Sequence, residues 1–289
     1  MTVYLNGAFV DRAAATVSVD DRGFLFGDGI YEVTRARDGA LFEWERHLRR
    51  LDRGLAGVAI ALAASVRDGL AEISERLLRE NGLDSGDAIV YLQITRGVAP
   101  RTHYFPPPGT PPTVFLSASR LTVPDELRAR GATAIAIPDI RWGRCDLKTV
   151  NLLPNVLAKQ QAVAAGAFEA ILVKDGVVTE GASSNVFVVK DGVLRTHPLG
   201  PHILAGVTRD VLFELVAELG LSANEAPVKA AELPGVSEVL VTATTADVMP
   251  IVRIDGRPVG DGRPGPVAGA LHAALRTRME RQCARAGVR

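Results

Sequence analysis

The chain has 289 residues, and its 33 lysines and arginines balance 33 aspartates and glutamates, so its formal net charge is zero. This balance argues against nucleic acid or an anionic membrane as the main partner. The longest uncharged apolar run, residues 55–66, is shorter than the ~20 residues that a membrane-spanning helix needs. The two cysteines, Cys145 and Cys283, lack metal-type spacing. We therefore expect a soluble cytoplasmic protein with no metal site and no nucleic-acid or membrane partner.

Residues 1–119 are expected to form a smaller N-terminal domain of mixed strands and helices. Its predicted elements are a hairpin over Val3–Val10 with an Asn6-Gly7 turn, helices over Glu45–Leu62 and Val66–Glu80, and strands over Ala88–Thr95 and Thr113–Ser119. The hairpin starts so early that no room is expected for a signal peptide. Residues 120–124, Arg-Leu-Thr-Val-Pro, form the predicted linker.

Residues 125–289 are expected to form the larger C-terminal domain. Its predicted elements are a strand over Thr133–Ile140, helices over Pro154–Ala165, Thr208–Leu219 and Val267–Ala286, and hairpins at Asp175-Gly176, Asp191-Gly192 and Asp255-Gly256. Strands and helices do not alternate regularly along the chain. This pattern favours an α+β layout over a doubly wound parallel sheet.

Lys148 and Glu180 are the most informative pair of residues. Lys148 follows Trp142 and Cys145 among apolar residues, where we expect partial burial. A lysine with the ordinary pKa of ~10.4 is neutral in only about one molecule in 2500 at pH 7. Burial or a neighbouring cation lowers that pKa and gives an amine able to attack a carbonyl carbon. Pyridoxal 5′-phosphate (PLP) enzymes need such a lysine and a carboxylate facing the pyridine nitrogen, although either residue alone is more often structural.

Residues 139–188 resemble the PLP-dependent aminotransferases of fold type IV, and most closely the bacterial D-amino acid aminotransferases. Further motifs of this family follow in the family's order: Phe26–Val33, His47–Leu51, Arg96–His103, Leu204–Asp210 and Val241–Thr245. The resemblance implies a two-domain α+β enzyme with PLP in the interdomain cleft and a barrel-like larger domain. It also implies a homodimer that acts on amino acids and 2-oxo acids.

Other common cofactor motifs are missing from the sequence. Gly27-x-Gly29 is followed by Glu32 where a dinucleotide fingerprint needs its third glycine. Neither a Gly-Lys-Ser/Thr phosphate loop nor a His-Glu-x-x-His zinc motif occurs. Nicotinamide, nucleoside triphosphate and zinc chemistry therefore lose support.

A phosphate site is predicted where Gly206-Val207-Thr208 opens a helix, because free amides and the positive helix end favour an anion. The alternative is an ordinary threonine N-cap. By resemblance, the cofactor is bound by Lys148 and by eight further residues: Arg50, Glu180, Ser183, Leu204, Val207, Thr208, Thr244 and Thr245. Arg50, Thr208, Thr244 and Thr245 would bind the phosphate, and Leu204 would pack against the ring. Ser183 would orient cofactor oxygens or form a turn.

The substrate site is expected at Tyr31, Val33, Arg101 and His103. An α-amino acid carries a carboxylate, which Arg101 can bind as a charged pair, with His103 and the Tyr31 hydroxyl as further donors. The Arg101-x-His103 spacing resembles the carboxylate trap of the D-amino acid enzymes, which in that family serves the neighbouring subunit. Without the resemblance, Arg-x-His before a proline run is usually a solvated loop.

The activity implied is transamination of D-amino acids such as D-alanine with 2-oxoglutarate or pyruvate as acceptor. Lys148 would hold PLP as a Schiff base and move a proton between the substrate Cα and the cofactor C4′, while Glu180 would keep the pyridine nitrogen protonated. Alternatives of the same fold are a branched-chain L-amino acid aminotransferase, an (R)-amine transaminase and an aminodeoxychorismate lyase. A non-catalytic ligand-binding module on the same scaffold is the alternative from another class.

Overall fold

A computed structural model describes residues 1–286, which divide into two compact units. Unit 1 contains Met1–Thr122, Leu147–Asn151 and the chain from Met279 onward, and unit 2 contains Val123–Asp146 and Leu152–Arg278. The short segment that carries Lys148 therefore belongs with the first part of the chain, although its neighbours on both sides belong to unit 2. The predicted division into residues 1–119, a linker at 120–124 and residues 125–289 stays a prediction.

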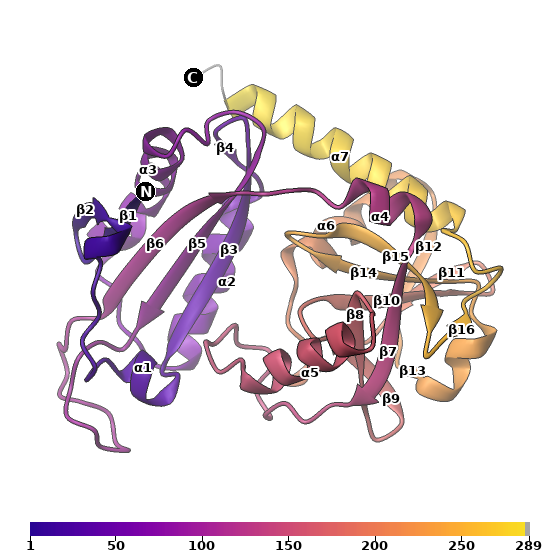
Figure 1. Cartoon of the computed structure of the whole chain (residues 1–289), viewed down its shortest axis with the longest axis horizontal. Coiled ribbons are helices and arrows are strands. Elements are labelled where there is room, and N and C mark those ends of the chain that lie inside the picture. Colours follow the sequence, from indigo (N-terminus) through magenta and orange to yellow (C-terminus); the bar gives the residue numbers. More distant parts are fainter. Residues whose placement is uncertain (287–289) are drawn as a thin grey trace. The chain divides into compact units, whose positions relative to one another are not determined.

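Unit 1 is built on a six-stranded antiparallel sheet in the order β2-β1-β6-β5-β3-β4. Its strands are β1 (Thr2–Leu5), β2 (Ala8–Asp11), β3 (Gly29–Arg37), β4 (Ala40–Leu41), β5 (Asp87–Thr95) and β6 (Thr113–Arg120) (Figure 1). Its helices are the 3-10 turn η1 (Arg12–Ala14), α1 (Arg22–Phe26), α2 (Trp44–Gly57) and α3 (Ala64–Glu80). Helix α2 packs on β3, and α3 packs on β1 and β6. Buried leucines of both helices, including Leu51 and Leu77, meet Ile30 and Leu116 of the sheet in one core.

Helix α2 ends at Gly57, five residues before the predicted end at Leu62. Ala59 takes the left-handed φ of 54°, which stops the helix. The guanidinium of Arg96 binds the carbonyl oxygens of Val58 and Ala59 at 2.7 and 2.8 Å, and so satisfies two carbonyls at this end. This partner is distant in sequence, so helical periodicity alone could not locate the end.

Unit 2 is built on a ten-stranded mixed sheet in the order β12-β11-β10-β14-β15-β7-β8-β9-β13, with β16 beside β15. Its strands are β7 (Ala132–Pro138), β8 (Glu169–Lys174), β9 (Val177–Gly181), β10 (Asn185–Lys190), β11 (Val193–Thr196), β12 (Ser222–Glu225), β13 (Val228–Lys229), β14 (Glu238–Ala243), β15 (Asp247–Ile254) and β16 (Arg257–Pro258). Its helices are α4 (Asp125–Arg130), α5 (Leu153–Ala164), α6 (Val207–Glu218) and the 3-10 segment η2 (Ala230–Gly235). Helix α7 (Pro266–Ala286) contributes residues to both units. Valines and isoleucines of β10, β14 and β15 fill the core of unit 2.

The predicted hairpin turns are confirmed. Asn6, Asp175, Asp191 and Asp255 have φ between 48° and 52°, and the glycine after each also has positive φ. Such Asn-Gly and Asp-Gly pairs tolerate the left-handed backbone that a two-residue hairpin turn requires. The expectation of an α+β layout is also confirmed, since antiparallel hairpins dominate both sheets. Among the described residues, no helix is both long enough and apolar enough to cross a membrane.

Candidate functional site

Lys148 lies beside the first residues of β3. The amide of Tyr31 donates to the carbonyl of Lys148, and the amide of Val150 donates to the carbonyl of Gly29, both at 3.0 Å. These bonds hold the segment along the strand and place the Lys148 ammonium 4.2 Å from the centroid of the Tyr31 ring. Within residues 1–286, its amino group makes no hydrogen bond or ion pair. A half-buried amine held without an acid partner suits a nucleophile better than a structural ion pair.

The neighbourhood of Lys148 is only partly buried, and the prediction about its flanks was mixed. Cys145, Leu147 and Thr149 are buried, whereas Trp142 and Leu153 are exposed. The Cys145 thiol donates to the carbonyl of Trp142, and burial raises the pKa of this thiol to about 11. Cys145 is therefore a protonated thiol at neutral pH.

Arg50 lies on α2 and pairs with Glu32 of β3. Its Nε and Nη2 donate to the two Glu32 carboxylate oxygens at 2.7 Å each, and His47 Nδ1 lies 2.8 Å from Glu32 Oε2. All three side chains are buried. Burial by itself raises the pKa of Glu32, but the charge and hydrogen bonds of Arg50, with His47, outweigh it and hold that pKa well below its usual range. The expected role of Arg50 in phosphate binding stays a prediction.

Tyr31 and Val33 alternate with Glu32 along β3, so their side chains point to the opposite face of the sheet. Both are half-buried, and the Tyr31 ring lies 5.8 Å from the ring of Tyr91 on β5. The structure thus brings Tyr31 together with Lys148 and places Val33 two residues further along the same face. Arg50 is bound on the other face through Glu32.

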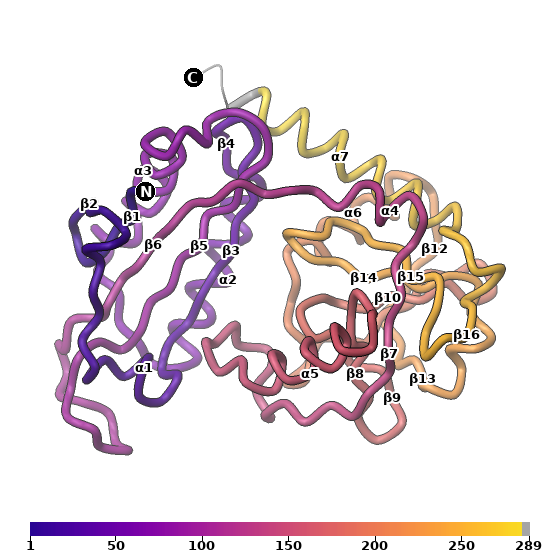
Figure 2. Tube along the Cα trace, in the orientation of Figure 1, coloured from indigo at the N-terminus to yellow at the C-terminus, as the bar shows by residue number. Residues whose placement is uncertain are grey.

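The segment between β5 and β6 runs without helix or extended strand (Figure 2). Arg101 and His103 lie on it, as predicted, and both are exposed. The guanidinium of Arg101 lies 5.1 Å from the centroid of the Phe26 ring, and the His103 ring lies 5.7 Å from the same ring. In the part of the chain that the structure describes, Arg101 has no acidic partner. An exposed arginine with an unpaired charge can bind a carboxylate ligand.

Glu180 is buried at the end of β9 in unit 2 and is held by groups from separate segments. Its Oε1 accepts from Asn185 Nδ2 at 2.7 Å and from the amide of Leu204 at 2.8 Å, and its Oε2 accepts from Arg141 Nη1 at 2.5 Å. Asn185 also donates to the carbonyl of Leu204. Two of the predicted cofactor residues, Glu180 and Leu204, are therefore directly bonded.

Arg141 donates to both Glu180 and Asp139, and the pKa values of these two acids shift in opposite directions. Burial raises the pKa of Glu180 to about 7, although Arg141 and the Leu204 amide act in the opposite direction. Burial also acts to raise the pKa of Asp139, but hydrogen bonds from Arg141 and Thr179 lower it to about 2. Asp139 is thus the ionised partner of Arg141 at neutral pH.

Helix α6 begins at Val207 with Gly206 as its N-cap, and no side chain caps it. Thr208 lies inside the first turn, so the alternative that Thr208 is the N-cap was wrong. A Cβ on Gly206 would come within 2.0 Å of Asn185 Oδ1, so only glycine permits this approach. The start of α6 is thereby fixed close to the groups that hold Glu180. Its role as a phosphate site stays a prediction.

Thr244 and Thr245 lie in the turn between β14 and β15, directly after the end of β14. Arg128 of α4 binds the chain just after these threonines: its Nη2 and Nε donate to the carbonyls of Ala246 and Val248 at 3.0 Å each. Thr242, the register partner of Asn185, has a buried hydroxyl without a hydrogen-bond partner among the described residues.

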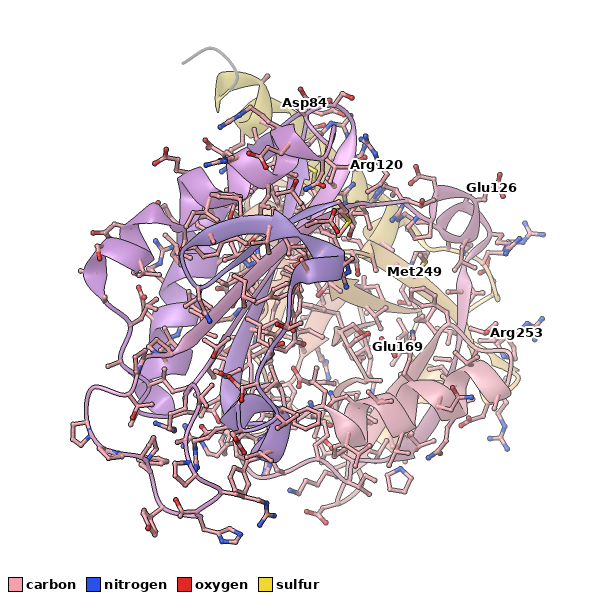
Figure 3. The ribbon with its side chains drawn as sticks, turned by 60° about the vertical axis from the view of Figure 1, so that its left-hand side comes forward. Asp84, Arg120, Glu126, Glu169, Met249 and Arg253 are labelled. Atoms are coloured by element: carbon pink, nitrogen blue, oxygen red, sulfur yellow. The ribbon has the colours of Figure 1, made fainter. Side chains whose placement is uncertain are left out.

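Ser183 is exposed, and its hydroxyl lies 3.2 Å from a carboxylate oxygen of Glu169. Ser184 donates to the same oxygen at 2.8 Å. Glu169, which Figure 3 labels, is a buried residue of β8. These bonds support the alternative that Ser183 forms part of a turn, whereas a cofactor contact stays a prediction.

Several residues of these clusters were not assigned from the sequence. Arg141 and Asn185 hold Glu180, Glu32 binds both Arg50 and His47, and Phe26 supports Arg101 and His103. One signal was available for Glu32, because a glutamate between apolar residues of a buried strand needs a cationic partner. The partners of Glu180 are brought together by the fold, and spacing along the chain does not reveal them.

The chain is similar to known proteins over most of its length. Residues 29–254 match the model of the amino-transferase class IV family. A D-alanine aminotransferase of Staphylococcus haemolyticus is 42% identical over 96% of this chain and 98% of its own, and one of Bacillus licheniformis is 42% identical over 95% and 96%. The crystal structure of the branched-chain amino acid aminotransferase of Escherichia coli superposes with a TM-score of 0.87 at 28% identity, covering 96% of this chain and 93% of its own.

A branched-chain amino acid aminotransferase of T.th., solved with pyridoxamine 5′-phosphate, has a TM-score of 0.85 at 30% identity and covers 97% of this chain and 94% of its own. The family match and both sets of relatives span most of the chain and include the segments that carry Lys148 and Glu180. The fold type predicted from the sequence is confirmed by these structures. The chain belongs to the class IV aminotransferase family.

Proposed function

We propose that this enzyme transfers the amino group of a D-amino acid, such as D-alanine, to a 2-oxo acid acceptor, either 2-oxoglutarate or pyruvate. The observation that carries the proposal is the 42% identity to two D-alanine aminotransferases over at least 95% of the chain. The branched-chain enzymes are less similar in sequence, at 28–30% identity, although their folds superpose well. PLP is the cofactor, and the substrates are small amino acids and 2-oxo acids.

The residues present fit PLP. Lys148 offers an amine without an acid partner among the described residues. Glu180 offers a buried carboxylate whose orientation is fixed on both oxygens. The uncapped start of α6 offers backbone amides for a phosphate, with Val207 and Thr208 in its first turn, and Thr244 and Thr245 add hydroxyls. Leu204, Ser183 and Arg50 complete the proposed set.

PLP, when bound, supplies an electron sink for the pair left behind when the substrate Cα–H bond breaks. Lys148 Nζ is proposed to take the proton from the substrate Cα and to deliver it to the cofactor C4′. Its amine is suited to this transfer because it has no competing acid partner among residues 1–286. Glu180 is proposed to hold a proton on the ring nitrogen, since a protonated ring nitrogen beside the carboxylate would favour the charged form of both groups. Tyr31 and Val33 line the substrate side of β3.

The substrate carboxylate is assigned to Arg101 and His103. Both are exposed and both lie against the Phe26 ring. Replacing Arg101 with alanine should raise KM for D-alanine about tenfold or more, the change expected when a charge-assisted hydrogen bond is lost. An amine without a carboxylate should be affected far less, and equal effects on both substrates would remove Arg101 from carboxylate binding.

A homodimer is proposed as the working assembly. Around the segment that carries Arg101 and His103, unit 1 exposes several large apolar side chains: Val19, Phe24, Val98, Tyr104 and Phe105, each at least half exposed. Exposed apolar groups gathered beside functional residues are typical of a protein interface. Size-exclusion chromatography with light scattering tests the assembly, and a monomer at working concentration would contradict it. A cytoplasmic location stays a prediction.

The activity is tested by incubating the PLP-loaded enzyme with D-alanine, with and without 2-oxoglutarate. Pyruvate should form in many turnovers only when the acceptor is present, together with one glutamate per pyruvate. The Lys148→Ala variant should bind PLP without covalent attachment and lose turnover. Pyruvate released in many turnovers without an acceptor would instead favour the lyase alternative. Near-normal rates in Lys148→Ala would end the proposal.

A further inference from the structure

The segment between β5 and β6, residues 96–112, carries Arg101 and His103 without helix or extended strand of its own. Long irregular segments on a protein surface are normally more mobile than the elements that they connect. A carboxylate site needs its donors held in a fixed direction, because orientation decides how strongly a charged pair binds. The segment therefore needs an anchor close to Arg101 and His103.

Arg22 of α1 supplies a contact at the required position. Its Nη1 donates at 2.8 Å to the carbonyl oxygen of Thr102, the residue between Arg101 and His103. Arg22 is only 3% exposed, and its guanidinium lies 4.7 Å from the centroid of the Phe26 ring. Phe26 is also the ring against which Arg101 and His103 lie. One residue thus binds the backbone of the pair and contacts the ring that supports both side chains.

Asp28 fixes Arg22 in turn. Arg22 Nε donates to Asp28 Oδ2 at 2.9 Å, and Arg96 binds both oxygens of Asp28 at 2.8 and 2.9 Å. Arg96 also lies 3.7 Å from the centroid of the Phe105 ring. The segment 96–105 is therefore tied to Asp28 directly through Arg96 and, near its middle, through Arg22 and Thr102.

A stabilising role explains this arrangement poorly. Two buried arginines share one carboxylate, and a buried ion network of this kind is weak evidence for stability because desolvation opposes the attraction. An apolar side chain at position 22 would fill the core without that cost. What only an arginine provides is a planar fork that binds the Asp28 carboxylate and the Thr102 carbonyl at once.

We propose that Arg22 is a positioning residue for the substrate carboxylate: its hydrogen bond to Thr102 sets the direction of Arg101 and His103. This inference rests on the proposed function, because that function assigns the carboxylate to these two residues. Arg22 itself does not touch the substrate. It acts through the backbone that carries them.

Arg22→Lys is the informative substitution, since lysine keeps the charge beside Asp28 but has no fork to reach both acceptors. Arg22→Gln is a second variant without the charge. Arg35→Lys is the matched control, because Arg35 is a 1%-exposed arginine of the same unit that pairs with Asp87. All three are compared with the wild type as full-length, PLP-loaded enzymes of verified thermal stability.

Two measurements are made on each enzyme. Hydrogen–deuterium exchange should be faster at the amides of residues 101–105 in Arg22→Lys and unchanged there in Arg35→Lys. KM for D-alanine should rise about tenfold in Arg22→Lys with kcat nearly unchanged, which corresponds to about 1.4 kcal/mol of lost binding. In the Arg101→Ala background, Arg22→Lys should add little to KM, because its effect passes through Arg101.

The outcomes separate this inference from the proposed function. Unchanged exchange at residues 101–105 in both Arg22 variants would overturn the inference alone. An unchanged KM for D-alanine in Arg22→Lys would also overturn the inference alone, provided that Arg101→Ala raises KM in the same assay. A wild type that ignores D-alanine, or an Arg101→Ala variant with normal KM, would overturn the proposed function and this inference with it.

Discussion

Two buried glutamates, one in each unit, are each bound by an arginine, yet their carboxylates behave in opposite ways. Glu32 is bound by Arg50 and His47, and its pKa is held well below the usual range despite burial. Glu180 is bound by Arg141, but burial raises its pKa to about 7. Burial acts to raise both pKa values. At Glu32 the charge and hydrogen bonds of Arg50, together with His47, outweigh burial, whereas at Glu180 Arg141 and the Leu204 amide do not, and Asp139 raises the pKa further.

This contrast separates a fixed charge from a responsive one. Glu32 stays ionised across the physiological range and serves as a permanent counter-charge for α2. Glu180 is held in a fixed orientation, and its pKa near neutrality allows both the charged and the neutral form. This suits a group proposed to stabilise a proton on a bound ring nitrogen. The same residue type thus acquires two roles from the balance between burial and its hydrogen-bonded partners.

The largest effect is expected from Glu180→Gln. The glutamine keeps the shape of the side chain, so PLP should still bind, but the ring nitrogen loses its anionic partner. Proton removal from Cα should slow by about 10²–10³-fold, the range seen when one electrostatic stabiliser is removed from an active site. Single-turnover absorbance with D-alanine measures this rate. An unchanged rate would take away the electron-sink role of Glu180.

A large effect on stability is expected from Glu32→Gln. This change leaves Arg50 and His47 buried without the carboxylate that they share, which costs about 3–5 kcal/mol. Urea unfolding of the cofactor-free protein at pH 7 measures the free energy. Glu180→Gln is the matched comparison and should lose less, because Arg141 keeps its bonds to Asp139. Equal losses would remove the contrast between the two carboxylates.

The pH dependence of stability should have opposite signs for the two residues. Glu180 has a folded pKa of about 7, above its ordinary value of 4.5, so its contribution is fully present below pH 4.5 and is lost as the pH rises toward 7. Glu32 has a lowered folded pKa, so its contribution is present above pH 4.5 and is lost as the pH falls further. Urea unfolding of the cofactor-free protein at several pH values resolves both.

Each variant should flatten its own part of that profile. Glu180→Gln should remove a decline between pH 4.5 and 7, and Glu32→Gln should remove a loss below pH 4.5. Cofactor-free protein is needed because bound PLP stabilises the folded state by mass action. A profile that is unchanged between pH 4.5 and 7 in Glu180→Gln would show that the carboxylate is not perturbed.

The smallest effect is expected from Arg128→Lys in unit 2. Arg128 binds two carbonyls next to the Thr244-Thr245 turn with its planar guanidinium. Lysine can donate to one of these carbonyls but cannot reach both. The dissociation constant for PLP should rise a few-fold, by about 0.5–1.5 kcal/mol for one hydrogen bond. Pyridoxal without phosphate is the control ligand and should bind as before. Equal weakening of both ligands would exclude an effect through the phosphate.

Elements with local signals were predictable from the sequence. The Asn-Gly and Asp-Gly turns, helices α3, α5, α6 and α7, and strands β5 and β6 lie within one or two residues of their predicted bounds, because each is encoded by adjacent residues. The end of α2 was not predictable, since Arg96 fixes it from a distance. Strand β3 was not assigned as a strand because polar and charged residues interrupt its apolar alternation.

The candidate site follows the same division. Lys148 and Glu180 were proposed from their types and flanks, and the resemblance added the rest of the proposed set. The bonds that give these residues their properties come from segments far apart in the chain, such as Arg141 and Leu204 at Glu180. Arg22 and Thr102 are 80 positions apart, so their contact appears only in the folded chain.

The most direct test of the D-amino acid assignment is the visible absorbance of the PLP-loaded enzyme mixed separately with D-alanine, L-leucine and (R)-1-phenylethylamine. We expect loss of the yellow band with D-alanine and little change with the other two. The amine lacks the carboxylate that is proposed to bind Arg101 and His103, and the sequence is more similar to the D-alanine enzymes than to the branched-chain L-amino acid enzymes. Loss of the band mainly with L-leucine or the amine would contradict the substrate assignment while leaving the cofactor site intact.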